Sequence, residues 1–124
     1  MMTFLGMKSP APNIPIIELE TPTGDVVDLY NDYQLRSVEL RGDELSFRFV
    51  SVSAGAPTGV QFSGVRDLRV VQPAGWVPQE ADQIEHFLIR PAGPWRCVVF
   101  KAGGFHYEFD CAVMTLAGST IEDT

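Results

Sequence analysis

A histidine and two carboxylates stand at every second position of one predicted strand, and they are the residues best suited to chemistry. In His106-x-Glu108-x-Asp110, strand alternation puts all three side chains on one face, about 7 Å apart at each step. An imidazole with two carboxylates can ligate a divalent metal or share acid–base work.

This row of residues needs a further ligand from another strand before it can hold an ion. Side chains that follow one another on one face of a straight strand splay apart, so His86 or Glu85 would have to complete the shell. The solvent face of an amphipathic strand explains the same residues without that requirement. We therefore expect no bound metal, no cofactor and no catalytic residue. A small metal- or ligand-binding protein or enzyme that uses the His106/Glu108 face is the alternative.

Trp76 and the two cysteines are the remaining candidates. Trp76 lies in a loop rich in proline and glycine, where a large aromatic residue often anchors an interface but can equally plug the open end of a sandwich. Cys97 and Cys111 are expected on opposite faces of one hairpin. A disulfide needs Cβ atoms within about 4.5 Å, so we predict two core cysteines instead.

The elements that position these residues are β-strands, because apolar residues repeat with a period of two along most of the chain. Residues 105–113 alternate in this way, with apolar side chains at the odd positions, and so do residues 44–49. Strands are predicted at residues 16–20, 25–30, 34–41, 44–53, 59–63, 66–72, 83–90, 95–102 and 105–116.

Two turns fix the pairing of four of these strands. Gly42-Asp43 and Gly103-Gly104 each predict a tight two-residue hairpin, because glycine adopts a positive φ at no steric cost. The second hairpin would place Tyr107 opposite Phe100. After Phe49 the apolar phase changes, which predicts a β-bulge there. Residues 78–82 are predicted as a short helical turn, and a full helix over 78–88 is the alternative.

The length of 124 residues fits one domain with a core of its own. We expect an extended or poorly ordered lead-in over residues 1–15, a single β domain over 16–118 and a flexible tail over 119–124. The fold predicted is all-β: an antiparallel sandwich or flattened barrel of eight to ten strands, with at most one short helix.

The net charge of −7 argues against nucleic acid as a partner, because such a surface repels phosphate groups. The nine lysines and arginines are also scattered along the chain and form no concentrated basic face. The same charge favours a basic protein partner through electrostatic steering, although it also simply keeps a small protein soluble. No apolar run approaches the roughly 20 residues of a membrane helix, and the first residues do not read as a signal peptide. We therefore expect no membrane association and a cytoplasmic location.

The segment from Tyr33 to Leu116 resembles a group of small bacterial all-β proteins, among them immunity proteins of polymorphic toxin systems and neighbours with no known role. The features that carry the resemblance are Leu35-x-x-Val38, Leu45-x-Phe47-x-Phe49, Val60-x-Phe62-x-Gly64-Val65-x-x-Leu68 and Phe105-x-Tyr107-x-Phe109-x-Cys111. This sequence departs from those proteins at Tyr30-Asn31-Asp32-Tyr33, where some of them carry a His-Asp-Ser type element. The resemblance implies a binding role that blocks a partner protein.

Three classes of function follow from these observations. The leading hypothesis is a non-enzymatic, immunity-like module that binds a basic protein. The second is the metal- or ligand-binding protein or small enzyme described above. The third is a self-associating subunit, a homo-oligomer whose outer faces carry Cys97 and Val99 as an exposed apolar patch.

Overall fold

The computed structural model describes residues 2–55, 57–72, 83–92 and 95–117, without the side chains of residues 91, 92, 95–97, 99 and 100. Eleven strands make up this part of the chain, and it contains no helix. They are β1 (Thr3–Leu5), β2 (Glu18–Glu20), β3 (Val26–Asp28), β4 (Tyr33–Arg41), β5 (Glu44–Ser51), β6 (Pro57–Ser63), β7 (Arg66–Val71), β8 (Ile84–Ala92), β9 (Trp95–Ala102), β10 (Phe105–Cys111) and β11 (Val113–Ala117).

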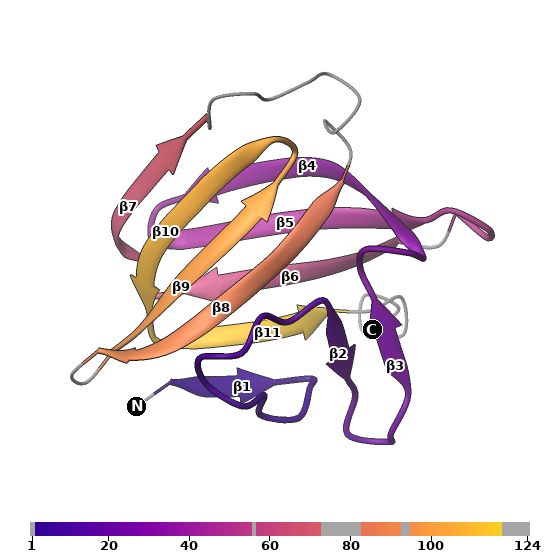
Figure 1. The fold of residues 1–124 in the computed structure, drawn as a ribbon, viewed down its shortest axis with the longest axis horizontal. Coiled ribbons are helices and arrows are strands. Elements are labelled where there is room, and N and C mark those ends of the chain that lie inside the picture. The colour runs from indigo at the N-terminus through magenta and orange to yellow at the C-terminus, as the bar shows by residue number, and fades with distance from the viewer. Residues whose placement is uncertain (1, 56, 73–82, 93–94, 118–124) are drawn as a thin grey trace.

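The strands form two layers and a small hairpin. Sheet A has the order β1-β11-β6-β5-β4, sheet B has the order β7-β10-β9-β8, and β2 pairs with β3. The strands of sheet B cross obliquely over those of sheet A (Figure 1). All named pairs are antiparallel except β1 with β11. The prediction of an all-β sandwich is confirmed, and the sheets do not close into a barrel.

Aromatic side chains join the two sheets. Phe47 of sheet A meets Tyr107 of sheet B edge to face, with ring centroids 5.1 Å apart. Phe62 of sheet A meets Phe109 of sheet B in the same manner at 4.9 Å. Such pairs add about 0.5–1.5 kcal/mol beyond the area that they bury. The sequence supplies them because each of these aromatics occupies an inward position of a strand that alternates with period two.

Both predicted hairpins have the expected register. Arg41 pairs with Glu44 across Gly42-Asp43, and Ala102 pairs with Phe105 across Gly103-Gly104, which places Tyr107 opposite Phe100. The φ angles of Gly103 and Gly104 are 60° and 82°, as a turn with two left-handed residues requires.

The predicted bulge lies on the partner strand. The register shifts between Leu35 and Ser37 of β4, so that Arg36 is the extra residue, while β5 continues without interruption. The apolar residues after Phe49 need no slip, because Val50 is half-buried on the outer face and Val52 is exposed.

The predicted strand over residues 105–116 is in fact two strands in different sheets. The chain leaves sheet B at Cys111 and enters sheet A at Val113, and the inward phase changes from odd to even positions. Val113 therefore faces outward and half-buried, whereas Met114 is buried. The break occurs at Ala112, whose N–H donates to the carbonyl of Ser63 and whose carbonyl accepts from Thr3.

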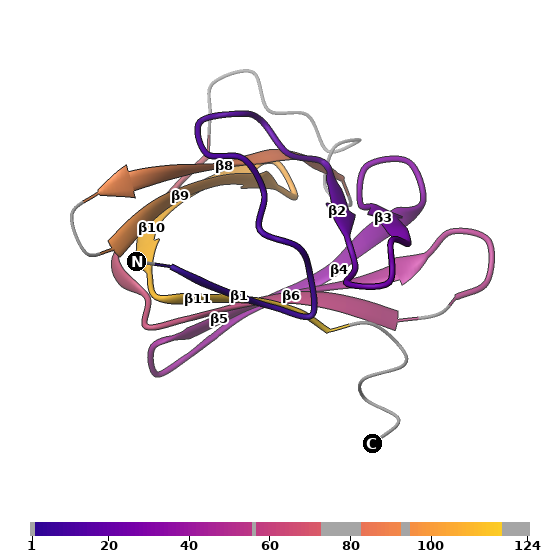
Figure 2. The same ribbon diagram turned by 90° about the horizontal axis from the view of Figure 1, so that it is seen from below.

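The amino-terminal segment connects the two layers along one side of the sandwich. It begins as β1 beside β11 and then passes to the edge of sheet B (Figure 2). There Ile16 and Phe87 exchange two backbone hydrogen bonds, and the N–H of Asn13 donates to the carbonyl of Ile89. Residues 16–30 thus pair within the chain, and Leu19 and Leu29 are buried by it. Trp76 and the helical turn predicted at 78–82 lie outside the described residues.

Replacing Phe47 by alanine should destabilise the domain by about 3–5 kcal/mol, because a buried ring is lost and the sheets cannot close the cavity fully. Phe47 is 0% exposed and meets rings from both sheets. The measurement is chemical denaturation followed by circular dichroism. Val71→Ala is the control, since Val71 is 55% exposed. A loss of less than about 1 kcal/mol in Phe47→Ala would contradict this account of the core.

Candidate functional site

The structure separates the two histidines that the sequence offered as metal ligands. His106 of β10 lies opposite Lys101 of β9, and Lys101 lies opposite His86 of β8. A lysine therefore stands between the two imidazoles in the register of sheet B. The Nζ of Lys101 lies 3.9 Å from an oxygen of Glu85. The Nε2 of His106 is buried and has no hydrogen-bond partner among the described residues.

The carboxylates of β10 face arginines of β7. Arg69 donates to Glu108 at 2.9 Å, and Asp110 lies opposite Arg66 in the register. Such an arrangement neutralises the acidic row by cross-strand pairing. Within the described ranges, no three histidine, cysteine or acidic side chains are placed to hold a metal ion. His106, Glu108 and Asp110 are all half-buried on this face.

Cys111 is buried, and its Sγ lies 3.9 Å from the Sδ of Met2. The register places Cys97 opposite Asp110 and Cys111 opposite Arg96, as the turn predicted. The side chains of Cys97 and Val99, which carried the hypothesis of self-association, lie outside those that the structure describes. Likewise, none of the described segments contains a helix that could cross a membrane.

A hollow on the outer face of sheet A has features that the sequence analysis did not identify. One row across four strands consists of Ala117, Gly59, Arg48 and Ser37, which pair successively from β11 to β4. Because three of these residues have small side chains or none, the row leaves a depression of about 490 Å³. We call this depression the arginine hollow; its lining is Arg36, Ser37, Arg48, Phe49, Val50, Pro57, Thr58, Gly59 and Ala117.

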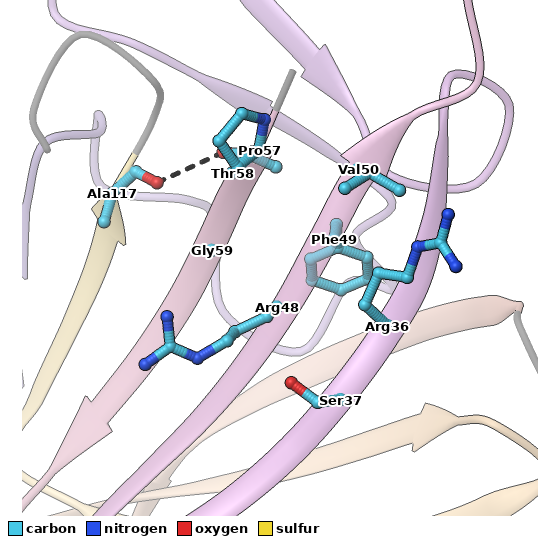
Figure 3. Close-up of a pocket in the computed structure, with 9 residues that line it drawn as sticks. All are labelled: Arg36, Ser37, Arg48, Phe49, Val50, Pro57, Thr58, Gly59 and Ala117. Carbon is cyan, nitrogen blue, oxygen red and sulfur yellow. Dashed lines mark hydrogen bonds between the residues drawn. The ribbon is translucent and has the colours of Figure 1, made fainter. Parts of the chain in front are cut away.

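Two arginines stand on opposite sides of the arginine hollow (Figure 3). The side chain of Arg48 extends over β6 beside Gly59, where no side chain occupies the space, and Arg36 extends the other way from β4. Arg36 is the extra residue of the bulge, so it adds a second cation beside Arg48. Both are exposed, and neither has a hydrogen bond or ion pair to any described residue.

The predicted hairpin at Gly42-Asp43 already contained part of this site. A two-residue turn there places Ser37 opposite Arg48, which brings Arg36 close to it. Sequence reasoning treated the cations as scattered because it considered their positions along the chain and not across the hairpin. The bulge at Arg36 and the proximity of Gly59 depend on pairings that no local pattern reveals.

A second charged surface is the acidic hairpin, which we define as residues 18–32 with strands β2 and β3. It carries five carboxylates and neither lysine nor arginine. Glu18 and Asp28 are direct cross-strand partners, and like charges in that relation destabilise a sheet. The exposed side chains of Val26 and Tyr30 lie on the same hairpin, 57% and 48% exposed respectively.

Asp28 is held by hydrogen bonds that favour its charged form. Its Oδ1 accepts from the backbone N–H groups of Tyr30 and Asn31, both at 3.0 Å, and its Oδ2 accepts from Nδ2 of Asn31 at 2.8 Å. Burial alone would raise the pKa of Asp28, but these three bonds together lower it below its ordinary value. The turn that ends the acidic hairpin is therefore organised around one ionised carboxylate.

Comparisons with known proteins support the fold alone. No family model matches the chain, and no curated protein matches it. The structure is similar to the crystal structure of an uncharacterised protein from Neisseria gonorrhoeae, with a TM-score of 0.51 and 8% sequence identity. The similarity covers 70% of this chain and 91% of that one.

Asp28→Asn should make the domain less sensitive to acid. Because the folded-state pKa of Asp28 lies below its ordinary 3.8, its carboxylate stabilises the fold above that pH. The contribution is lost as the pH falls through the lower folded-state pKa. Thermal unfolding midpoints between neutral pH and about pH 2 measure the effect. Asp32→Asn, at an exposed position of the same turn, is the control. An unchanged acid transition in Asp28→Asn would contradict the role given to this carboxylate.

Proposed function

We propose that this chain is a non-enzymatic binding module, immunity-like in its action, whose acidic hairpin holds a basic protein partner. The observation that carries the proposal is the cross-strand pair Glu18–Asp28. Two carboxylates directly opposite one another cost stability in the isolated domain. A cationic partner that lies across both of them turns that cost into favourable interaction.

The charge around this pair supports the same partner. Glu20 and Asp25 are exposed on the hairpin, and Lys8 is the cation that reaches it among the described residues, at 2.7 Å from Glu20. An exposed ion pair of that kind contributes little and exchanges readily with other partners. Negative potential therefore dominates this surface and would steer a basic protein toward it.

Exposed apolar side chains give the surface more than charge. Val26 and Tyr30 expose about half of their area beside the carboxylates. Tyrosine is enriched among the residues that dominate binding energy, and polar groups that exclude water commonly surround such residues. A basic partner with an apolar centre would match this combination. The cytoplasmic location expected from the sequence belongs to the same proposal.

Glu18→Gln should raise stability while it weakens binding of the partner. Removing one of two opposed charges should stabilise the fold by about 0.2–1 kcal/mol, measured by chemical denaturation. Capture from lysate of the source cells with immobilised parent protein, washed at low and at high salt, should retain a basic protein that leaves at high salt. The variant should retain less of that protein.

Glu44→Gln is the matched control for this experiment, because Glu44 is an exposed glutamate on a different sheet. It removes the same charge from the molecule and should leave the captured partner unchanged. Equal loss in both variants would mean that net charge and not the hairpin holds the partner. Full retention by Glu18→Gln would contradict the proposal.

A further inference from the structure

The arginine hollow is lined by two arginines, and neither has an acidic partner among the described residues. Most of the other basic groups of the described sheets have acidic neighbours: Arg41 pairs with Glu39, Arg69 with Glu108, Lys101 lies near Glu85, and Arg66 lies opposite Asp110. Arg90 of β8, the exception, lies opposite Cys97. Arg36 and Arg48 have none, and the hollow contains no acidic lining residue. In a chain of net charge −7, the hollow is therefore a locally positive surface.

The shape of the hollow suits a small molecule. Its volume of about 490 Å³ falls within the range of about 300–1,000 Å³ that is usual for ligand sites. Val50 and Pro57 provide apolar lining, and Ser37 adds a hydroxyl group. The hydroxyl of Thr58 donates to the carbonyl of Ala117 at 3.3 Å and so fixes the end of β11 at the rim.

The positions of the two guanidinium groups select among anions. Each presents a planar set of donors that matches a carboxylate with two parallel hydrogen bonds. In Figure 3 the groups extend to opposite sides of the hollow and do not converge on one point. A compact anion such as phosphate would reach one of them, so a ligand that pairs with both needs an anionic group at each end.

We propose that the arginine hollow binds a dicarboxylate with a short apolar spacer, one carboxylate on Arg36, the other on Arg48, and the spacer against Val50 and Pro57. Gly59 contributes by leaving the surface of β6 open. A Cβ at this position would lie 3.4 Å from the carbonyl oxygen of Phe47 and 3.9 Å from that of Ala117, and it would project into the space beside Arg48. This site is separate from the acidic hairpin, so the result of its test does not depend on whether the proposed function is correct.

The test is a titration of the folded, isotope-labelled chain with adipate, followed by amide and arginine Nε–H resonances in two-dimensional NMR. Hexanoate, which has the same chain length and one carboxylate, and inorganic phosphate are titrated at equal ionic strength. Adipate should shift the resonances of residues lining the hollow with an affinity about tenfold higher than hexanoate, since it gains one more charge-assisted pair.

Variants locate the site. Arg36→Gln and Arg48→Gln should each reduce the affinity for adipate to about that for hexanoate, a loss of about tenfold. Arg41→Gln is the matched control, because Arg41 is an 80% exposed arginine on the same strand and should bind adipate as the parent does. Since the sequence contains Glu122 and Asp123 after Ala117, each titration is repeated in E122Q/D123N, which removes these two carboxylates.

Saturable adipate shifts that both arginine variants weaken and Arg41→Gln preserves would establish the site. The proposal is overturned if adipate gives no saturable shift with either the parent or E122Q/D123N. It is overturned equally if hexanoate or phosphate binds as tightly as adipate, or if R36Q/R48Q binds adipate as tightly as the parent.

Discussion

Contact between the inner faces of two sheets is the interaction on which the rest of this molecule depends. Phe47 and Phe62 extend from sheet A, Tyr107 and Phe109 extend from sheet B, and the rings meet edge to face. Once these faces are buried, the alternate residues of every strand are committed to the outside. The acidic row of β10 and the cations of β4 and β5 are outward for this reason, and both charged surfaces derive from it.

The hairpins were predictable because their information is local. Gly42-Asp43 and Gly103-Gly104 identify the turns, and alternation on either side sets which residues face each other. The limits of most strands followed from the same pattern. The pattern could not indicate the break at Ala112, since the apolar phase shifts by one residue there without proline or glycine to mark it. The pairing of β1 with β11 was equally hidden, because three residues carry no periodicity that could be recognised.

The candidate sites differ in the same way, in how far local sequence information reveals them. The row of His106, Glu108 and Asp110 was visible as a motif, yet its chemistry depends on Lys101 and Arg69 from neighbouring strands. The arginine hollow has no motif at all, because Arg48 and Gly59 come together only through the pairing of β5 with β6. The acidic hairpin lay between these cases: the charges could be counted, but the opposition of Glu18 and Asp28 required the register. Sites formed by neighbours across a sheet cannot be recognised from the order of residues along the chain.

The parallel pairing of β1 with β11 also dictates when sheet A can be completed. Thr3 to Leu5 lie beside Val113 to Thr115, so the first strand has no partner until the last strand has been synthesised. During translation, β4, β5 and β6 can form a meander as they emerge, because β4 pairs with β5 and β5 with β6, and each pairing closes only a short loop. The strand β1 therefore stays unpaired outside the ribosome until β11 has emerged. The same holds for Met2 and Met7 on either side of it, which are buried in the folded domain. The nascent chain therefore carries this apolar segment unpaired until β11 has been made, and closure of the sandwich is the event that ends its exposure to chaperones and to other nascent chains.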